Sequence, residues 1–210
     1  MFDYLIQNGT LIDGTGAPAA VGDVAIKDGK IAAVGDLKDA SAGTVLDAAG
    51  KYVTPGFIDI HRHADAALFR PHFGELELKQ GLTTIVNGNC GLSAAPFGGA
   101  HDAAIRAYLR PITGDIPEAL PAVSMAAYLS ALRALPLHTG MLVGMGTLRA
   151  AAAGYELERL EDEHYRAIHR AMEQALADGA LGVSLGLGYA PECFCTTEEL
   201  LRALAPLRGQ

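Results

Sequence analysis

From residue 54 onward, short apolar segments alternate with segments of helical pattern, and this alternation constrains the fold more than any other feature of the chain. The apolar segments cover residues 57–60, 83–87, 140–144 and 182–186. The clearest helical pattern covers residues 160–177, where apolar side chains recur every four residues. Strands that alternate with helices predict βα units with a parallel sheet. We count four such units, and a closed barrel needs eight.

Two of the predicted helices carry capping signals. Ser124 precedes a helical pattern over residues 125–135, where it can act as the N-cap. The segment Thr196-Thr197-Glu198-Glu199 reads as a capping box that opens a helix running nearly to the end of the chain.

The first fifty residues have a different pattern, in which short β-rich segments are separated by turn residues. Segments 4–6 and 10–12 flank Asn8-Gly9, and segments 24–27 and 30–34 flank Asp28-Gly29. An Asp-Gly pair between two apolar runs is a strong signal for a two-residue hairpin. We therefore expect a small β domain over residues 1–53 and the strand–helix region over residues 54–210.

Composition narrows the class of function. The net charge of −8 and the absence of a Lys/Arg run argue against a nucleic-acid partner. No segment approaches 18 uninterrupted apolar residues, so we expect no membrane span. The N-terminus lacks the pattern of a signal peptide, which makes the cytoplasm the default location. Three cysteines are an odd number and do not suggest a disulfide framework.

The sharpest chemical signal is the pair His61 and His63, directly after the apolar segment 57–60. Side chains two apart in a strand share a face, and two neutral imidazoles at this spacing can bind one divalent cation. A bare pair of this kind more often marks two exposed loop histidines. The preceding apolar strand and Pro55-Gly56 shift the balance towards metal ligands. Asp65 could orient the pair through hydrogen bonds.

A second signal, Asn87-Gly88-Asn89-Cys90-Gly91, follows the next strand. Glycines on both sides let the backbone bring a thiol close to a ligand, and a thiolate is a good zinc ligand. Seen alone, Cys90 would more often be a buried structural cysteine. The other histidines lie in helical patterns or lack ligand spacing, and Cys193-Phe194-Cys195 alone is weak evidence for a metal site.

Together these segments resemble the amidohydrolase superfamily, and specifically its D-aminoacylase branch. The resemblance is carried by residues 53–63, 80–91, 142–149 and 179–191, so it spans nearly the whole chain. The block around His61 and His63 marks the superfamily. The Asn89-Cys90-Gly91 block is more specific, because many relatives bridge their metals with a modified lysine from a later strand.

The resemblance implies an α/β fold, a partial TIM-like (β/α) barrel with a small N-terminal β-sandwich domain assembled from both ends of the chain. It implies zinc-dependent hydrolysis of the amide bond of N-acyl-D-amino acids, which releases a carboxylate and a D-amino acid. His61 and His63 would ligate the first metal position, and Cys90 would be the bridging or zinc-binding thiolate. Zinc would occupy one tight site, with a second, weaker site as an option. Tyr189 would contact the acyl or carbonyl region of the substrate, or it is a packing residue.

The chain departs from the family pattern in several places. Met145 stands where relatives often have histidine, and Arg62 stands where a small hydroxyl residue is common. The family's two further metal-binding histidines and its catalytic aspartate come from later strands, so we expect them beyond Gln210. On that basis we expect the chain alone to be inactive, and to self-associate or to be completed by another polypeptide. The alternatives are a cyclic-amide hydrolase of the dihydroorotase or hydantoinase kind, and a non-catalytic metal-binding fragment.

Overall fold

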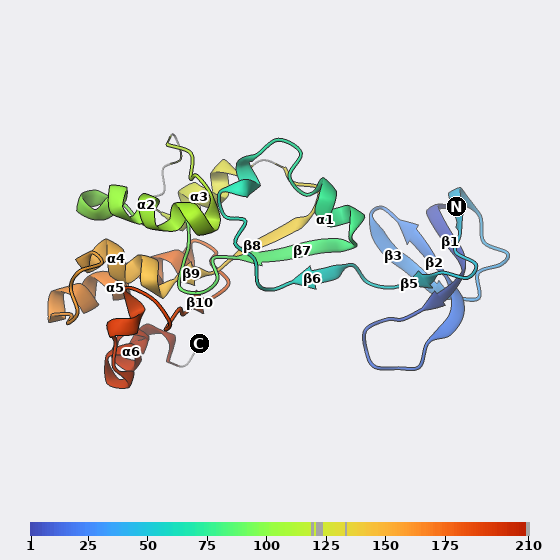
Figure 1. Ribbon diagram of the computed structural model, residues 1–210. Helices are drawn as coiled ribbons and strands as arrows, with labels where there is room; N and C mark the ends of the chain where they lie inside the picture. The colour runs from blue at the N-terminus through green and yellow to red at the C-terminus, as the bar shows by residue number, and fades with distance from the viewer. Residues whose placement is uncertain (119, 121–123, 133, 209–210) are drawn as a thin grey trace. The chain divides into compact units, whose positions relative to one another are not determined.

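The computed structural model describes residues 1–118, 120, 124–132 and 134–208. The chain divides into two compact units, Met1–Gly56 and Phe57–Gln210 (Figure 1). Residue 133, within the helix predicted over residues 125–135, lies outside the described residues.

The first unit is one mixed sheet of five strands. These are β1 (Phe2–Leu11), β2 (Ala20–Lys27), β3 (Lys30–Gly35), β4 (Ala42–Asp47) and β5 (Tyr52–Val53). The order is β3-β2-β1-β4, with β5 also paired to β1. Strand β1 pairs antiparallel with β2 and parallel with β4 and β5. The β-sandwich that the resemblance implied is not seen in residues 1–56, which form this single sheet.

The two turn signals of the first unit have different outcomes. Asp28 and Gly29 both have positive φ, of 52° and 71°, and join β2 to β3 as the predicted antiparallel hairpin. Asn8-Gly9, in contrast, does not separate two strands, because β1 runs through it with a register shift against β2. Asn8 has a φ of 63°, and its N–H donates to Asp23 Oδ1 at 2.9 Å. A buried carboxylate thus stabilises a β-bulge there.

The second unit contains the strands of the predicted barrel. Strands β6 (Phe57–Asp59), β7 (Leu82–Asn87) and β8 (His138–Met141) form one parallel sheet, and β9 (Val143–Gly144) pairs parallel with β10 (Val183–Ser184). Leu142 separates β8 from β9, and its N–H donates to Asn87 O at 2.9 Å. The parallel pairing predicted from strand–helix alternation is confirmed, and the described residues form no closed barrel.

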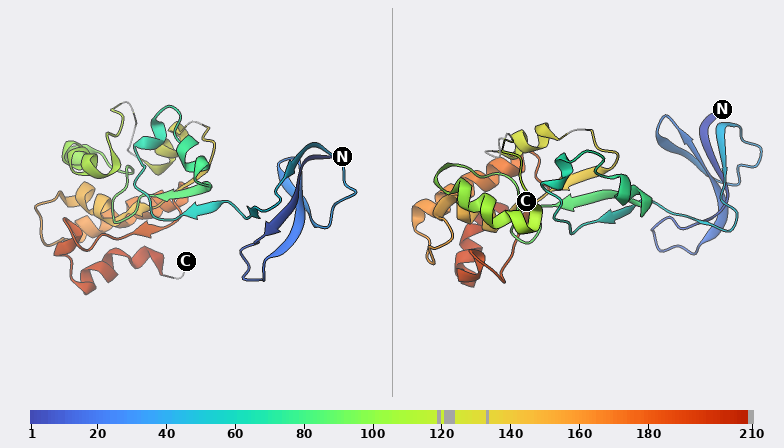
Figure 2. Two further views of the ribbon diagram at one scale, coloured as in Figure 1. Left: turned by 45° about the vertical axis from the view of Figure 1, so that its right-hand side comes forward. Right: turned by 45° about the horizontal axis from the view of Figure 1, so that its top comes forward.

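Helices connect these strands. They are α1 (Glu75–Lys79), α2 (Asp102–Thr113), α3 (Met125–Ala131), α4 (Met145–Ala153), α5 (Asp162–Ala177) and α6 (Thr197–Ala203), with short 3₁₀ turns η1 (Ala67–Phe69), η2 (Gly99–His101), η3 (Glu192–Phe194) and η4 (Ala205–Leu207). Ser124 caps α3 and the Thr196 capping box opens α6, as predicted. Helix α6 ends at Ala203, earlier than the sequence pattern suggested. Helices α4 and α5, orange in Figure 2, pack against each other.

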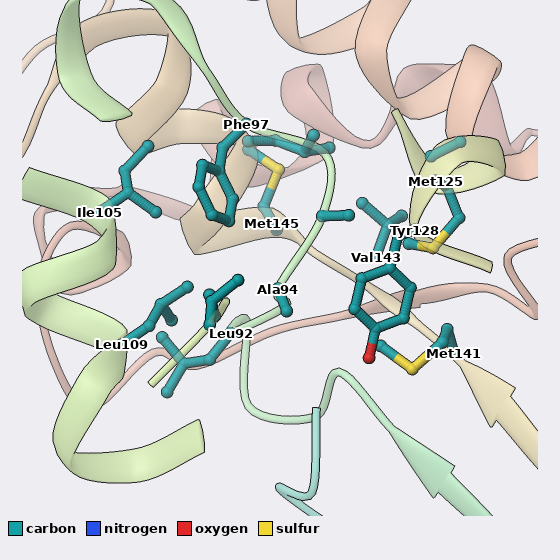
Figure 3. Packing of buried hydrophobic residues seen from close by; sticks show 14 of the residues in the cluster. Leu92, Ala94, Phe97, Ile105, Leu109, Met125, Tyr128, Met141, Val143 and Met145 are labelled. Carbon is teal, nitrogen blue, oxygen red and sulfur yellow. The ribbon is translucent and has the colours of Figure 1, made fainter. Parts of the chain in front are cut away.

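A buried apolar cluster fixes the strand ends of the second unit. The cluster includes Leu92 and Ala94, on the segment after β7, together with Ile105 and Leu109 of α2 (Figure 3). The core also contains Ile85 of β7. None of the helices in the described part of the chain combines the length and hydropathy of a membrane span. The strands that end near His61 and Cys90 are therefore held by a well-packed core.

Truncating this core should destabilise the chain. Ile85 is fully buried in β7, and replacing a buried isoleucine by alanine leaves a cavity that costs about 2–5 kcal/mol. We expect Ile85→Ala to lower the free energy of unfolding by that amount in urea denaturation followed by circular dichroism. Leu201→Ala, at an exposed position of α6, is the control and should change it by less than about 1 kcal/mol. Equal effects of the two substitutions would contradict the assigned core.

Candidate metal centre

The segment that carries the two histidines is fixed by polar contacts at the end of β6. Asp59 Oδ1 accepts from the N–H of His61 at 3.1 Å, and its Oδ2 accepts from Arg62 Nη1 at 3.3 Å. Arg62 also donates to Glu77 Oε1 of α1 at 2.5 Å. The guanidinium is thus bound by two carboxylates, so Arg62 supports the histidine segment from the side of α1.

Two asparagines tie the same segment to β7. The side-chain oxygen of Asn87 accepts from the N–H of Ala64 at 2.9 Å, and its amide donates to Thr139 of β8. Asn89 Nδ2 donates to Arg62 O and Val86 O. Both side chains are buried. Neither tether was predicted from the sequence, although buried side-chain amides are expected to have hydrogen-bond partners.

The loop that carries Cys90 passes unusually close to neighbouring strands. Cys90 has a φ of 57°, and Gly88 on its N-terminal side has a φ of 74°. A Cβ at Gly88 would lie 2.1 Å from Leu142 O, and one at Gly186 would lie 2.1 Å from Cys90 O. Only glycine fits both positions, so backbone packs directly on backbone at this loop.

Residues from three other segments of the chain form hydrogen bonds with the loop. Ser184 Oγ, at the end of β10, accepts from Gly91 N–H at 2.9 Å and donates to Gly88 O at 2.5 Å. The N–H of Thr147 in α4 donates to Gly91 O at 3.0 Å. Tyr189 donates from its hydroxyl to Cys90 O at 2.7 Å. The peptide groups around Cys90 are therefore held on both sides.

The structure brings together all three predicted ligands. The ligand atoms of His61, His63 and Cys90 lie within 4.8 Å of one another, and His61 Nε2 is 3.1 Å from Cys90 Sγ. Ligand atoms about 2.0–2.3 Å from a tetrahedral zinc ion lie roughly 3.3–3.8 Å from one another, so small side-chain adjustments would bring these three atoms to one ion. His63 Nδ1 is buried without a hydrogen-bond partner among the described residues. The donor set and the unpartnered nitrogen both fit a bound metal ion.

Electrostatics favour the neutral, metal-binding form of His63. Burial lowers the pKa of His63, and the neighbouring charge of His61 lowers it further. A neutral imidazole has a lone pair for a metal. The surroundings of His63 therefore prepare it as a ligand near neutral pH.

Asp65 has a different environment from the expected one. It is fully buried, and its Oδ1 accepts from Ala94 N–H at 3.2 Å, while Tyr128 of α3 donates to its main-chain oxygen. Burial raises the pKa of Asp65 to about 6, against the effect of backbone hydrogen bonds. No hydrogen bond joins it to His61 or His63 within the described residues. The suggestion that Asp65 orients the histidine rings is therefore not supported.

The remaining histidines and cysteines lie elsewhere. His164 accepts from Glu161 N–H in the capping box of α5, and His169 contacts Arg202 O. Cys193 and Cys195 are free thiols, and in the part of the chain that is described they belong to no metal-ligand cluster. Met145 is buried in the apolar core.

Comparison with known proteins assigns the family. The profile described as the Amidohydrolase family matches residues 44–207. The chain belongs to the amidohydrolase family. It is 40% identical over 208 residues to the D-aminoacylase of Alcaligenes xylosoxydans xylosoxydans. The aligned region covers 98% of this chain and 42% of that protein.

Solved amidohydrolase structures agree with this assignment. A crystal structure of D-aminoacylase matches with a TM-score of 0.84 and 38% identity, over 99% of this chain and 43% of that one. The N-acyl-D-glutamate deacylase of Bordetella bronchiseptica, complexed with zinc and a phosphonate mimic of the tetrahedral intermediate, matches with a TM-score of 0.80 and 36% identity. That match covers 99% of this chain and 44% of that one. The chain thus spans less than half the length of the relatives it matches.

The close packing around Cys90 predicts an asymmetry between two glycines. Gly88→Ala should lower the free energy of unfolding by more than about 2 kcal/mol, because the new Cβ meets Leu142 O and the left-handed φ costs an alanine about 1–2 kcal/mol. Gly188 has nothing within 4 Å of an added Cβ, so Gly188→Ala should change it by about 1 kcal/mol or less. Urea denaturation of both variants tests this. A tolerated Gly88→Ala would rule out the described loop packing.

Proposed function

We propose that this chain contributes the first barrel strands and the first metal ligands of a zinc-dependent hydrolase that cleaves N-acyl-D-amino acids into a carboxylate and a D-amino acid. The observation that carries the proposal is the meeting of His61, His63 and Cys90 at the ends of β6 and β7. The 40% sequence identity to D-aminoacylase over nearly the whole chain supports N-acyl-D-amino acids as the substrate class. In this proposal, residues 54–210 are the first half of a (β/α) barrel, and residues 1–53 are part of a β-sandwich.

The three ligands suit zinc by their chemistry. Two neutral imidazoles and one thiolate form a mixed nitrogen and sulfur set that leaves one tetrahedral position open. A bound zinc ion would polarise the amide carbonyl and lower the pKa of a water molecule. The chain's own residues hold Cys90 and the histidines in place. We assign the tight site to these three residues, and a second, weaker site to ligands shared with later strands.

The proton transfer needs a carboxylate, and the described residues place no free carboxylate beside His61, His63 and Cys90. Asp59 is engaged with His61 N–H and Arg62, and Asp65 is buried against Ala94 N–H. We therefore propose that an aspartate from a later barrel strand takes the proton from the water and passes it to the leaving amine. General acid–base catalysis of this kind contributes about 10²–10⁴-fold. The chain alone should lack this contribution.

We propose that Tyr189 borders the substrate. Its side chain is 37% exposed, and its hydroxyl is engaged with Cys90 O. Burial raises the pKa of Tyr189, and a side-chain hydrogen bond with Cys90 acts in the same direction. The hydroxyl therefore stays protonated, and the exposed part of the ring is available to the acyl group.

Zinc binding is the first test of the proposal. Titration of the metal-free chain should give one tight site, and Cys90→Ala should weaken it more than the 10–100-fold that loss of an outer partner typically costs. Cys193→Ala is the control, since Cys193 is an exposed thiol outside the cluster. Competition with a chromophoric chelator measures both. Equal affinities of the two variants would contradict the assignment of Cys90.

Substrate class is the second test. We expect no measurable D-amino-acid release by the chain with zinc, and zinc-dependent release once it is joined to the second half of a D-aminoacylase. Chiral chromatography should show release from N-acyl-D but not N-acyl-L substrates. Opening of hydantoin or dihydroorotate rings instead would favour a cyclic-amide hydrolase. Zinc binding without turnover in the joined protein would favour the non-catalytic alternative.

A further inference from the structure

Glu192 is a buried acidic residue close to the metal centre, with no role in the chemistry described above. It is the first residue of η3 and follows the segment Gly188-Tyr189-Ala190-Pro191. Its exposed fraction is 2%. A carboxylate buried to this degree costs free energy unless hydrogen bonds and charges compensate it. The groups that surround Glu192 are therefore the evidence for its role.

One oxygen of Glu192 contacts three segments of the chain. Oε2 accepts from the N–H of Gly186, two residues after the end of β10, at 3.0 Å. The same oxygen lies 1.8 Å from the position of a Cβ at Gly91 and 2.7 Å from that of a Cβ at Gly146. These glycines follow β7 and β9 respectively. The carboxylate therefore sits where the ends of β7, β9 and β10 meet.

The two oxygens of Glu192 are not equally satisfied. Burial raises the pKa of Glu192 to about 7, while the N–H groups of Gly186 and Gly146 and the charge of Arg149 lower it. Arg149 of α4 is fully buried and donates to the main-chain oxygens of Leu157 and Glu158. Oε1 of Glu192 has no hydrogen-bond partner among the described residues. Burial of a carboxyl group with one unpaired oxygen costs free energy of folding, so a contribution to packing stability alone does not explain Glu192.

The glycines that Glu192 contacts, Gly91 and Gly186, both border the peptide group of Cys90. Gly91 is the next residue in the chain, and its Cα faces Oε2. Gly186, which Oε2 holds, packs against Cys90 O. The carboxylate thus supports the two glycines that border Cys90, in addition to the hydrogen bonds of Ser184 and Thr147 to Gly91.

We propose that Glu192 is a positioning residue for the Cys90 thiolate, locking the loop after β7 so that Sγ faces His61 and His63. The inference rests on the proposed function, because it gives the thiolate its purpose as a zinc ligand. Outer residues that orient metal ligands are typically worth 10–100-fold in metal affinity. Glu192 would be such a residue that acts through the backbone.

The test compares Glu192→Ala and Glu192→Gln in the whole chain. The alanine variant should weaken zinc binding at least about 10-fold and shift the thiolate-to-metal charge-transfer band of the cobalt-substituted chain. The glutamine variant should stay within about 3-fold of wild type, because its amide oxygen can accept from Gly186 in the same space. Asp23→Ala is the matched control. Asp23 is also a buried carboxylate that accepts from two backbone N–H groups, in the first unit, and its loss should leave zinc affinity unchanged.

A metal-free measurement separates this inference from the proposed function. Alkylation of the metal-free chain, mapped by peptide mass spectrometry, should label Cys90 at least about 5-fold faster in Glu192→Ala, because a released loop opens more often. Labelling of Cys193 should not change. A wild-type chain that binds no zinc would contradict the proposed function, and the labelling comparison would still test the positioning role.

Several outcomes would overturn the positioning role. One is a Glu192→Ala variant with unchanged zinc affinity, cobalt spectrum and Cys90 labelling. Another is equal loss of zinc affinity in Glu192→Ala and Asp23→Ala, which indicates general stability. If Glu192→Ala does not fold, Glu192→Asp replaces it, since it keeps the charge but withdraws the oxygen from Gly186. Zinc binding weakened in the aspartate but not the glutamine variant supports the inference, and the reverse pattern contradicts it.

Discussion

The direct packing of backbone on backbone at the Cys90 loop is the constraint on which the rest of the site depends. Gly88 lies against Leu142 O, and Gly186 lies against Cys90 O, with no room for a side chain at either glycine. This contact fixes where the thiol emerges relative to the ends of β9 and β10. Because a metal site requires ligand atoms placed to a fraction of an ångström, a loop without this constraint could not present Cys90 reliably to His61 and His63.

The candidate metal centre combines an apolar core with polar side chains that bond to backbone. The core holds β7 through Ile85, whereas the ligand segments are held by side chains that bond to backbone, namely Asp59, Asn87, Asn89 and Ser184. Polar networks of this kind specify geometry when their members are satisfied. Apolar packing therefore places the strands, and polar residues at their ends, such as Asp59, Asn87 and Ser184, fix the segments that follow them.

The sequence predicted those features that depend on local pattern. The Asp28-Gly29 hairpin, the caps at Ser124 and Thr196 and the parallel strands follow from neighbouring residues or from periodicity. The meeting of His61 with Cys90 was predictable because parallel strands end at one edge. The bulge at Asn8, the tethers by Asn87 and Asn89 and the contacts of Glu192 were not predicted, because each depends on a partner distant in sequence. The expected role of Asp65 in orienting the histidines was not supported for the same reason, because its carboxylate accepts from the N–H of Ala94, which is distant in sequence.

X-ray absorption spectroscopy of the zinc-loaded chain tests the central claim most directly, namely that His61, His63 and Cys90 bind one metal ion. We predict one sulfur ligand at about 2.3 Å and nitrogen ligands at about 2.0–2.1 Å. The sulfur ligand should disappear in Cys90→Ala and persist in Cys193→Ala. A zinc spectrum without sulfur, or with sulfur that survives the loss of Cys90, would contradict the account.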